Sequence, residues 1–236
     1  MIERGKKMML LETKKLSNIY DNNRGLHEAS FSLQAGRILA LVGGNGAGKS
    51  TLIRLLTGQE KQKSGEIIWH KPQAIRYMPD DVDFPSMLTA AEILQLLASL
   101  KKIGKKEQED VLRRVALWDV RKQKVKHFSK GMRQRLNLAQ SLLGDGSLLI
   151  LDEPTVGIDP VLRKSIWETF RQLKESGTSI IVTTHVMDEA EKCDRLAMIR
   201  NGKIIAIDSP KQLITRSNTQ TMEEAFLFYG GVEDEN

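Results

Sequence analysis

The chain has 236 residues, of which 40% are hydrophobic and 28% are charged. This length can bury the core of one large domain, or of a domain with a small insert. The single cysteine, Cys193, excludes an internal disulfide framework and suits a reducing compartment, where we expect it to serve packing. No apolar run approaches the roughly 20 residues that a membrane-spanning helix needs. Residues 1–9 are basic and lack a long apolar stretch, so they do not resemble a secretory signal.

The net charge is +6, and its distribution is uneven. Residues 101–135 contain 13 Lys or Arg and four Asp or Glu. Such a basic segment could meet nucleic acid, anionic lipid or an acidic partner. The favoured interpretation is simpler, a solvated face on a helical region.

Three early segments predict a small antiparallel sheet. They are Leu10–Leu16, Ala29–Leu33 and Glu66–Trp69. Gly36 and Gly65 are expected to mark turns beside them.

A second group of segments predicts a larger, mostly parallel sheet. Ile38–Val42, Ser147–Leu151 and Ser179–Thr183 are short and apolar enough to be covered on both faces. Thr51–Leu56 continues as a helix after the first of them. The alternation of strands and helices indicates an α/β fold.

The segment from Thr89 to Phe128 has a helical pattern and predicts a helical insert. Two apolar faces are expected, and they are formed by Leu94, Leu97 and Leu100 and by Val111, Val115 and Trp118. Ser129 is expected to cap the next helix, 130–143.

The C-terminal part contains two helix-start signals and a tail. Ser209-Pro210 is typical of a first helical turn, and Thr221-x-x-Glu224 fits a capping box. The acidic run 233–235 is expected to be a frayed tail.

One nonapeptide predicts a phosphate-binding P-loop. Gly43-x-x-x-x-Gly48-Lys49-Ser50 follows a strand and opens a helix, which is the context that this motif requires. Its glycines allow backbone N–H groups to surround phosphate oxygens at a helix N-terminus. Lys49 would reach the β- and γ-phosphates, and the Ser50 hydroxyl would bind Mg²⁺. The expected nucleotide-binding residues of this loop are Gly43, Gly44, Asn45, Gly46, Ala47, Gly48, Lys49, Ser50 and Thr51.

Two carboxylates follow the apolar strand Leu148–Leu151. Asp152 suits a Mg²⁺ contact, directly or through water, and Glu153 suits a general base that activates the attacking water. Beside a P-loop, this pairing favours nucleotide hydrolysis over a simple surface charge.

With these motifs, the chain resembles an ATP-binding cassette (ABC) ATPase from about Leu10 to Phe226. The resemblance implies a P-loop core with a mostly parallel sheet, a small antiparallel β-subdomain and an inserted helical subdomain. It implies one domain over 1–236, with 1–80 and 129–236 forming the core and 81–128 the helical insert.

The family's signature loop, most commonly Leu-Ser-Gly-Gly-Gln, matches Phe128-Ser-Lys-Gly-Met132. The resemblance implies that Ser129, Gly131 and Met132 touch the γ-phosphate of ATP held by the P-loop of a second subunit. A helix N-terminus favours such an anion. Lys130 departs from the pattern, and the sequence does not explain it.

Three further residues match family positions. Tyr20 resembles the aromatic residue that stacks on adenine, although a buried core tyrosine is the competing interpretation. Asp159, in Gly157-Ile-Asp-Pro160, resembles the loop that couples the two sites of a dimer. His185 resembles the catalytic switch histidine that contacts the γ-phosphate.

Asp80 is the larger departure, because the family has a glutamine that contacts Mg²⁺ and the attacking water. Aspartate can still ligate Mg²⁺ and join the catalytic set, with a negative charge and a shorter reach. Asp81 is an adjacent competitor for this role.

The resemblance therefore implies an ATP-hydrolysing subunit that powers a membrane transporter, with ATP and Mg²⁺ as its ligands. Its expected partners are separate integral membrane subunits and a second ATP-binding subunit, in a homodimer, without specific nucleic acid. It would lie in the cytoplasm, peripheral on the inner face of the membrane. The motif strings are most similar to those of ATPases of copper-processing transporters that mature nitrous-oxide reductase, and of related exporters.

Two alternatives remain from the sequence. One is a soluble ABC ATPase that acts on nucleic acid or ribosomes through the basic segment. The other is a regulatory module that binds ATP without hydrolysing it.

Overall fold

A six-stranded sheet forms the centre of the computed structural model, which describes residues 8–21, 24–71 and 74–231. Its strand order is β5-β6-β7-β3-β8-β9, and all neighbours are parallel except β8 and β9, which form an antiparallel pair. The strands are β3 (Ile38–Val42), β5 (Ile75–Met78), β6 (Leu148–Asp152), β7 (Ser179–Thr184), β8 (Arg195–Arg200) and β9 (Lys203–Asp208). The predicted α/β fold with a mostly parallel sheet is confirmed. β5, β8 and β9 were not predicted.

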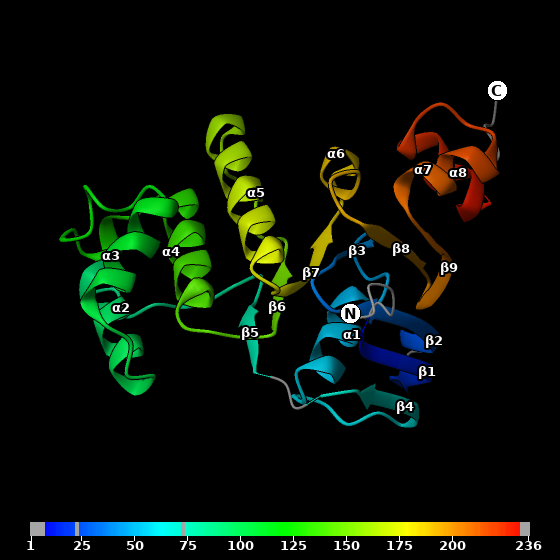
Figure 1. Cartoon of the computed structure of the whole chain (residues 1–236), viewed down its shortest axis with the longest axis horizontal. Coiled ribbons are helices and arrows are strands. Elements are labelled where there is room, and N and C mark those ends of the chain that lie inside the picture. The colour runs from blue at the N-terminus through cyan, green and yellow to red at the C-terminus, as the bar shows by residue number, and fades with distance from the viewer. Residues whose placement is uncertain (1–7, 22–23, 72–73, 232–236) are drawn as a thin grey trace, which may run out of the picture.

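The apolar strands are buried on both faces, as their composition requires. Along β3, Ile38, Ala40 and Val42 face one core cluster, while Leu39 and Leu41 face another. Each cluster is closed by a different layer of the molecule (Figure 1).

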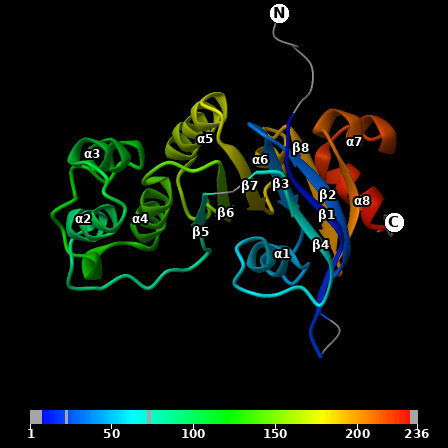
Figure 2. The same ribbon diagram turned by 60° about the horizontal axis from the view of Figure 1, so that its bottom comes forward.

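The first layer is the predicted antiparallel sheet, in the order β2-β1-β4. Its strands are β1 (Met9–Ile19), β2 (Gly25–Gln34) and β4 (Ser64–Trp69). Helix α1 (Lys49–Leu56) packs between this sheet and the large one (Figure 2).

Gly65 does not mark a turn, as the sequence suggested, but lies inside β4. It has a φ of 83°, and a Cβ there would come within 2.3 Å of the Lys15 carbonyl oxygen. The close approach falls beside the register shift between Lys14 and Ser17, so this glycine accommodates an irregularity in strand pairing. Gly36, by contrast, lies in the predicted turn.

Helices cover the other face of the large sheet. They are α4 (Lys130–Leu142), α5 (Pro160–Glu175), α6 (Met187–Ala190), α7 (Pro210–Ser217) and α8 (Met222–Gly230). Cys193 is buried in this core, and burial raises the pKa of its thiol, in agreement with a packing role.

The segment predicted to be helical contains α2 (Ala90–Leu100), α3 (Lys105–Arg114) and a short 3₁₀ turn (Val125–His127). With α4, these helices form the end of the molecule away from the antiparallel sheet (Figures 1 and 2). Two details of the prediction were wrong. Leu100 is 78% exposed rather than part of an apolar face, and Trp118 lies beyond the end of α3.

The predicted helix caps are confirmed. Ser129 caps α4, Ser209 caps α7, and Thr221 and Glu224 form a capping box on α8. The acidic run 233–235 lies outside the described residues. Within the described part of the chain, none of the helices is both long and apolar enough to cross a membrane.

Candidate functional site

The P-loop connects the carboxyl end of β3 to the first turn of α1. Gly48 has a φ of 111°, and a Cβ there would lie 2.8 Å from the Gly25 carbonyl oxygen. Gly43 is equally constrained, since a Cβ would lie 2.3 Å from the carbonyl oxygen of Ile199. Both positions need glycine because neighbouring backbone fills the space of a side chain.

Lys49 is buried, and its ammonium group points back over the loop. Its Nζ donates to the carbonyl oxygens of Gly43 at 2.6 Å and Gly44 at 3.2 Å. It also lies 3.9 Å from Glu153 Oε1. A buried cation therefore stands between the loop and the predicted general base.

A cavity of about 480 Å³ brings most of the predicted site together. It is lined by Tyr20, Arg24, Gly25, Asn45, Gly46, Ala47, Gly48, Lys49, Ser50, Thr51, Arg54, Asp80, Asp152 and Glu153. Arg24 and Arg54 were not predicted, because neither belongs to a local sequence motif. Both add positive charge where a triphosphate would lie.

Tyr20 has a partner that fixes its position. Its hydroxyl donates to Glu60 Oε2 at 2.7 Å, and Asn18 Nδ2 donates to the same oxygen at 2.6 Å. Glu60 also pairs with Arg54 at 3.1 Å. The half-buried ring lines the cavity rather than the core, which favours the adenine-stacking interpretation.

Asp152 lies at the end of β6 and is 5% exposed. Its Oδ1 accepts a hydrogen bond of 2.5 Å from the Thr183 hydroxyl of β7. Burial raises the pKa of this carboxyl, and nearby Asp80 and Glu153 act in the same direction, against that hydrogen bond. The ionised form of Asp152 is therefore energetically unfavourable unless a cation binds beside it.

Glu153 has an unusual backbone conformation for a residue other than glycine, with a φ of 48°. Its N–H donates to the Thr183 hydroxyl at 2.9 Å, and its carbonyl accepts from Gln134 Nε2 of α4 at 3.0 Å. The side chain points toward His185, whose Nδ1 lies 3.3 Å from Oε2. Strained backbone of this kind clusters at functional sites, and here it aims a carboxylate into the cavity.

Asp80 lies just beyond β5 and faces the same cavity. Burial raises the pKa of its carboxyl, as do Glu153 and Asp81, whereas Lys130 and Lys49 oppose the shift. Three carboxylates therefore meet near the P-loop, from the loop after β5, the last residue of β6 and the residue after β6.

Magnesium fits this arrangement only together with phosphate. Among the residues that the structure describes, no group of three or more His, Cys, Asp or Glu is placed to hold a metal alone. Mg²⁺ usually takes one or two carboxylates and completes its shell with phosphates and water. Ser50, Asp152 and Asp80 line one cavity and match that requirement.

Gly43, Gly44 and His185 do not line the cavity themselves, although Lys49 contacts the two glycines and Glu153 contacts the histidine. The other four predicted residues that do not line it belong to two loops. Ser129, Gly131 and Met132 begin α4, where the Ser129 hydroxyl accepts from the Met132 N–H at 3.2 Å. Asp159 caps α5 by accepting from the Leu162 N–H at 3.0 Å. The two loops are neighbours, because a Cβ on Gly131 would lie 3.0 Å from the Gly157 carbonyl oxygen.

Glu189 of α6 is a polar residue that the sequence analysis missed. It is 1% exposed, and it accepts from Thr155 Oγ1 at 2.5 Å and from Thr184 Oγ1 at 2.9 Å. Arg163 Nε lies 3.7 Å away. This carboxylate joins the turn after Glu153 to the residue before His185. In the sequence, the signal that could have identified it was its position shortly after His185.

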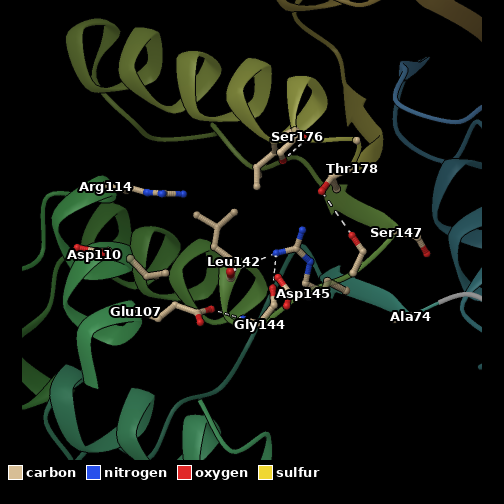
Figure 3. Close-up of a pocket in the computed structure, with 15 residues that line it drawn as sticks. Ala74, Glu107, Asp110, Arg114, Leu142, Gly144, Asp145, Ser147, Ser176 and Thr178 are labelled. Carbon is tan, nitrogen blue, oxygen red and sulfur yellow. Dashed lines mark hydrogen bonds between the residues drawn. The ribbon is translucent and has the colours of Figure 1, made fainter. Parts of the chain in front are cut away.

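A second hollow lies near the amino ends of β5, β6 and β7 (Figure 3). Its volume is about 670 Å³, and Ala74, Ser147 and Thr178 line it just before β5, β6 and β7 begin. Glu107, Asp110 and Asp145 line it together with Arg76 and Arg114, so it has charges of both signs. Arg76, a buried cation of this hollow, donates to the carbonyl oxygens of Leu142, the last residue of α4, and of Gly144.

Together, the loop, the buried cation and the carboxylates define a P-loop nucleotide-binding protein. A family model described as "ABC transporter" matches residues 26–156, more than half of the chain. The chain belongs to the ABC transporter family, as an ATP-binding domain.

Named relatives agree with this assignment. The chain is 36% identical to "Linearmycin resistance ATP-binding protein LnrL" of Bacillus subtilis (strain 168), over 92% of the chain and 78% of that protein. It is 30% identical to "Probable multidrug ABC transporter ATP-binding protein YbhF" of Escherichia coli (strain K12), over 92% of the chain. Here the chain spans only 41% of the relative's length. These names concern drug resistance, and they give no support to a copper-processing type.

Solved structures show the same fold. "Structure of ATP binding subunit of ABC transporter" superposes with a TM-score of 0.83 and 28% identity, covering 94% of this chain and 99% of that one. A dimeric ATP-binding cassette, MJ0796 with ADP and Pi, has a TM-score of 0.77 over 85% of this chain and 98% of its own, and its 20% identity supports the fold alone.

Proposed function

We propose that this chain is the ATP-hydrolysing subunit of an ABC exporter whose membrane part is a separate polypeptide. The observation that carries the proposal is the contact set of Glu153, which lies between Lys49 and His185 at the edge of the P-loop cavity. Family membership supplies the ATPase activity, and the drug-resistance relatives favour export. The cargo is left open, and copper processing has no observation behind it.

In the proposed reaction, the P-loop N–H groups and Lys49 bind the phosphates of ATP, and Tyr20 stacks on the adenine. Glu153 accepts a proton from the attacking water, and His185 hydrogen-bonds to the γ-phosphate and orients Glu153. Mg²⁺, held by Ser50, Asp152 and Asp80, would neutralise phosphate charge.

The position of the signature loop supports the proposed closure of a dimer. Ser129, Gly131 and Met132 lie outside the cavity of their own subunit, so they are free to contact ATP held by a second copy of the chain. ATP would favour the closed pair because it binds both surfaces there, and Asp159 would link the two sites. We propose residues 81–128 as the helical subdomain that passes closure to membrane subunits on the inner face of the membrane.

The basic segment favours the nucleic-acid alternative less than its charge suggests. Arg113 and Arg121 lie over the ring of Trp118, at 4.3 and 3.7 Å from its centroid. Arg135 donates to the carbonyl oxygen of Ala116 at 2.8 Å. These cations stabilise the packing of the helical region instead of forming a free binding face.

Glu153→Gln tests the proposal. The purified wild-type chain should hydrolyse Mg-ATP, and the variant should lose about 10²- to 10⁴-fold in kcat because it lacks the general base. Glu168→Gln is the matched control, since Glu168 is an exposed α5 residue that pairs with Arg171.

The transporter assignment is tested by trapping Glu153→Gln with ATP in native membranes and identifying the proteins that co-purify. Integral membrane subunits are expected. Recovery of RNA or ribosomal proteins alone would overturn the assignment in favour of the alternative.

A further inference from the structure

Helix α2 carries an apolar stripe on its solvent side. Leu96 and Leu100 are 56% and 78% exposed. They lie four residues apart, so they are neighbours on one side of the helix. The side that packs into the core is formed by other residues, Ile93, Leu94 and Ala98. Leucine side chains gain free energy when they leave water, so this stripe is suited to a partner that offers an apolar environment.

Two residues anchor the loop between α2 and α3. Lys101 Nζ donates to the Leu143 carbonyl oxygen at 3.2 Å. Ile103 is half-buried, and a Cβ on Gly144 would lie 3.1 Å from its Cδ1. Because both side chains face the residues after α4, the loop is held in place, and the lysines that follow each of them are left at the surface.

Three exposed lysines extend the apolar stripe toward α3. Lys102 lies in the loop, and Lys105 and Lys106 begin α3. In the part of the chain that the structure describes, no carboxylate forms an ion pair with any of them. Two of them begin a helix, where the helix dipole disfavours a cation, so they do not stabilise α3. We call Leu96, Leu100, Lys102, Lys105 and Lys106 the α2–α3 patch.

The carboxylates of α3 have other neighbours. Glu107 Oε1 accepts from the Gly144 N–H at 2.6 Å. Glu109 pairs with Arg113 at 2.6 Å. Asp110 lines the hollow near the amino ends of β5, β6 and β7 (Figure 3). The α2–α3 patch therefore keeps a positive charge.

The combination of lysines with aliphatic side chains selects one class of partner. An anionic membrane surface offers negative headgroups to the lysines and an apolar layer to the leucines. Nucleic acid would also offer negative charge, but single strands are bound by stacking the bases on aromatic or arginine side chains. The α2–α3 patch contains neither, so its chemistry matches lipid better than nucleic acid.

We propose that the α2–α3 patch binds the anionic headgroups of a lipid bilayer, with Leu96 and Leu100 entering the boundary between headgroups and acyl chains. The three lysines supply the electrostatic attraction, and the two leucines supply the apolar contact. The five residues are distinct from those that line the P-loop cavity, so the two surfaces can be occupied at the same time. This inference goes beyond the proposed ATPase function, because the contact needs no membrane subunit.

Sedimentation of the purified chain with lipid vesicles tests the proposal. The chain should bind vesicles of phosphatidylcholine and phosphatidylserine, should not bind pure phosphatidylcholine, and should bind less as salt is added. The triple variant Lys102→Gln, Lys105→Gln, Lys106→Gln should lower the partition coefficient by at least about tenfold, because each lysine near an anionic surface contributes about fivefold.

The matched control removes the same charge from other surfaces. It is the triple variant Lys61→Gln, Lys164→Gln, Lys211→Gln, whose lysines are all exposed. Its partition coefficient should stay within about threefold of wild type. Equal losses in the two triple variants would show that net charge alone drives binding, and would overturn the proposal.

A fluorophore at the end of the apolar stripe tests insertion. An environment-sensitive dye on Leu100→Cys should shift to shorter wavelength with phosphatidylserine vesicles, because the site enters an apolar layer. The native Cys193 is buried and would not compete for the label. The same dye on Glu168→Cys, an exposed position of α5, should not respond. An unchanged spectrum of the Leu100→Cys chain on phosphatidylserine vesicles would contradict the proposal.

The remaining outcomes are also decisive. Absence of vesicle binding would overturn the proposal, and salt-dependent RNA binding that is lost in the Lys102, Lys105 and Lys106 variant would assign the patch to nucleic acid instead. These measurements use no ATP, so their failure leaves hydrolysis through Glu153 standing. A chain that binds vesicles but does not hydrolyse Mg-ATP would overturn the proposed function and leave the patch.

Discussion

At the scale of single residues, the site holds carboxylates in an environment that resists their ionisation. Asp152 is buried beneath Thr183, and Asp80 and Glu153 lie near it. The free-energy cost of ionising these carboxylates is compatible with function, because a cation that arrives with the nucleotide would remove that cost.

Asp152→Asn should therefore stabilise the chain while it abolishes activity. Burial raises the pKa of Asp152 in the folded chain above its value in the unfolded chain, which is about 3.9. The protonated carboxyl therefore contributes its full stability below the unfolded pKa, and this contribution is lost as the pH rises through the folded pKa. The variant should unfold at a higher temperature than wild type at neutral pH, and this gain should disappear at acidic pH. Its kcat should fall by on the order of 10²-fold or more.

Thermal unfolding without nucleotide between pH 4 and 8 provides the measurement, with Asp119→Asn as an exposed control. A variant that is less stable than wild type at neutral pH would refute the argument.

At the scale of elements, the sequence predicted what depends on local pattern. The apolar runs of β3, β6 and β7 predicted a doubly covered sheet because parallel strands must be buried on both faces. The caps of α4, α7 and α8 were predicted because a cap needs only its own first turn. β5, β8 and β9 escaped notice, since charged residues interrupt or flank their apolar runs, which weakens the pattern relative to the uncharged runs of β3 and β7.

Glu189 shows how elements are joined at the site. Glu189→Gln should cost about 1–3 kcal/mol of stability, because Thr155 and Thr184 donate to different carboxylate oxygens and the amide nitrogen that replaces one of them cannot accept. It should also lower kcat by about tenfold, since the turns that carry Glu153 and His185 lose their common partner. Chemical denaturation and steady-state kinetics would measure the two effects.

Glu191→Gln is the matched control, two residues away and exposed. If both variants behaved alike, Glu189 would have no special part in joining the turns.

At the scale of the whole molecule, the chain holds the P-loop site and the signature loop on separate surfaces. Ser129→Arg should leave the ATP affinity of the isolated chain within about twofold of wild type, because Ser129 does not line its own cavity. ATP-driven pairing should be lost, since a bulky side chain would block the second subunit. Calorimetry and light scattering in a Glu153→Gln background would measure binding and pairing.

Ser176→Arg, just after the C-terminal end of α5, is the control and should pair normally. Loss of ATP binding by the isolated Ser129→Arg chain would show that the serine belongs to its own subunit's site.

The sequence by itself determined the phosphate-binding loop, the two carboxylates after β6 and the family, because each depends on contiguous residues. The tertiary structure decided the rest of the site. Arg24, Arg54 and Glu189 acquired neighbours from distant segments, and Asp80 joined Asp152 and Glu153 in one cavity only because β5 pairs with β6 in the sheet. The physical reason is that charge compensation depends on distance in space, which a linear pattern does not specify.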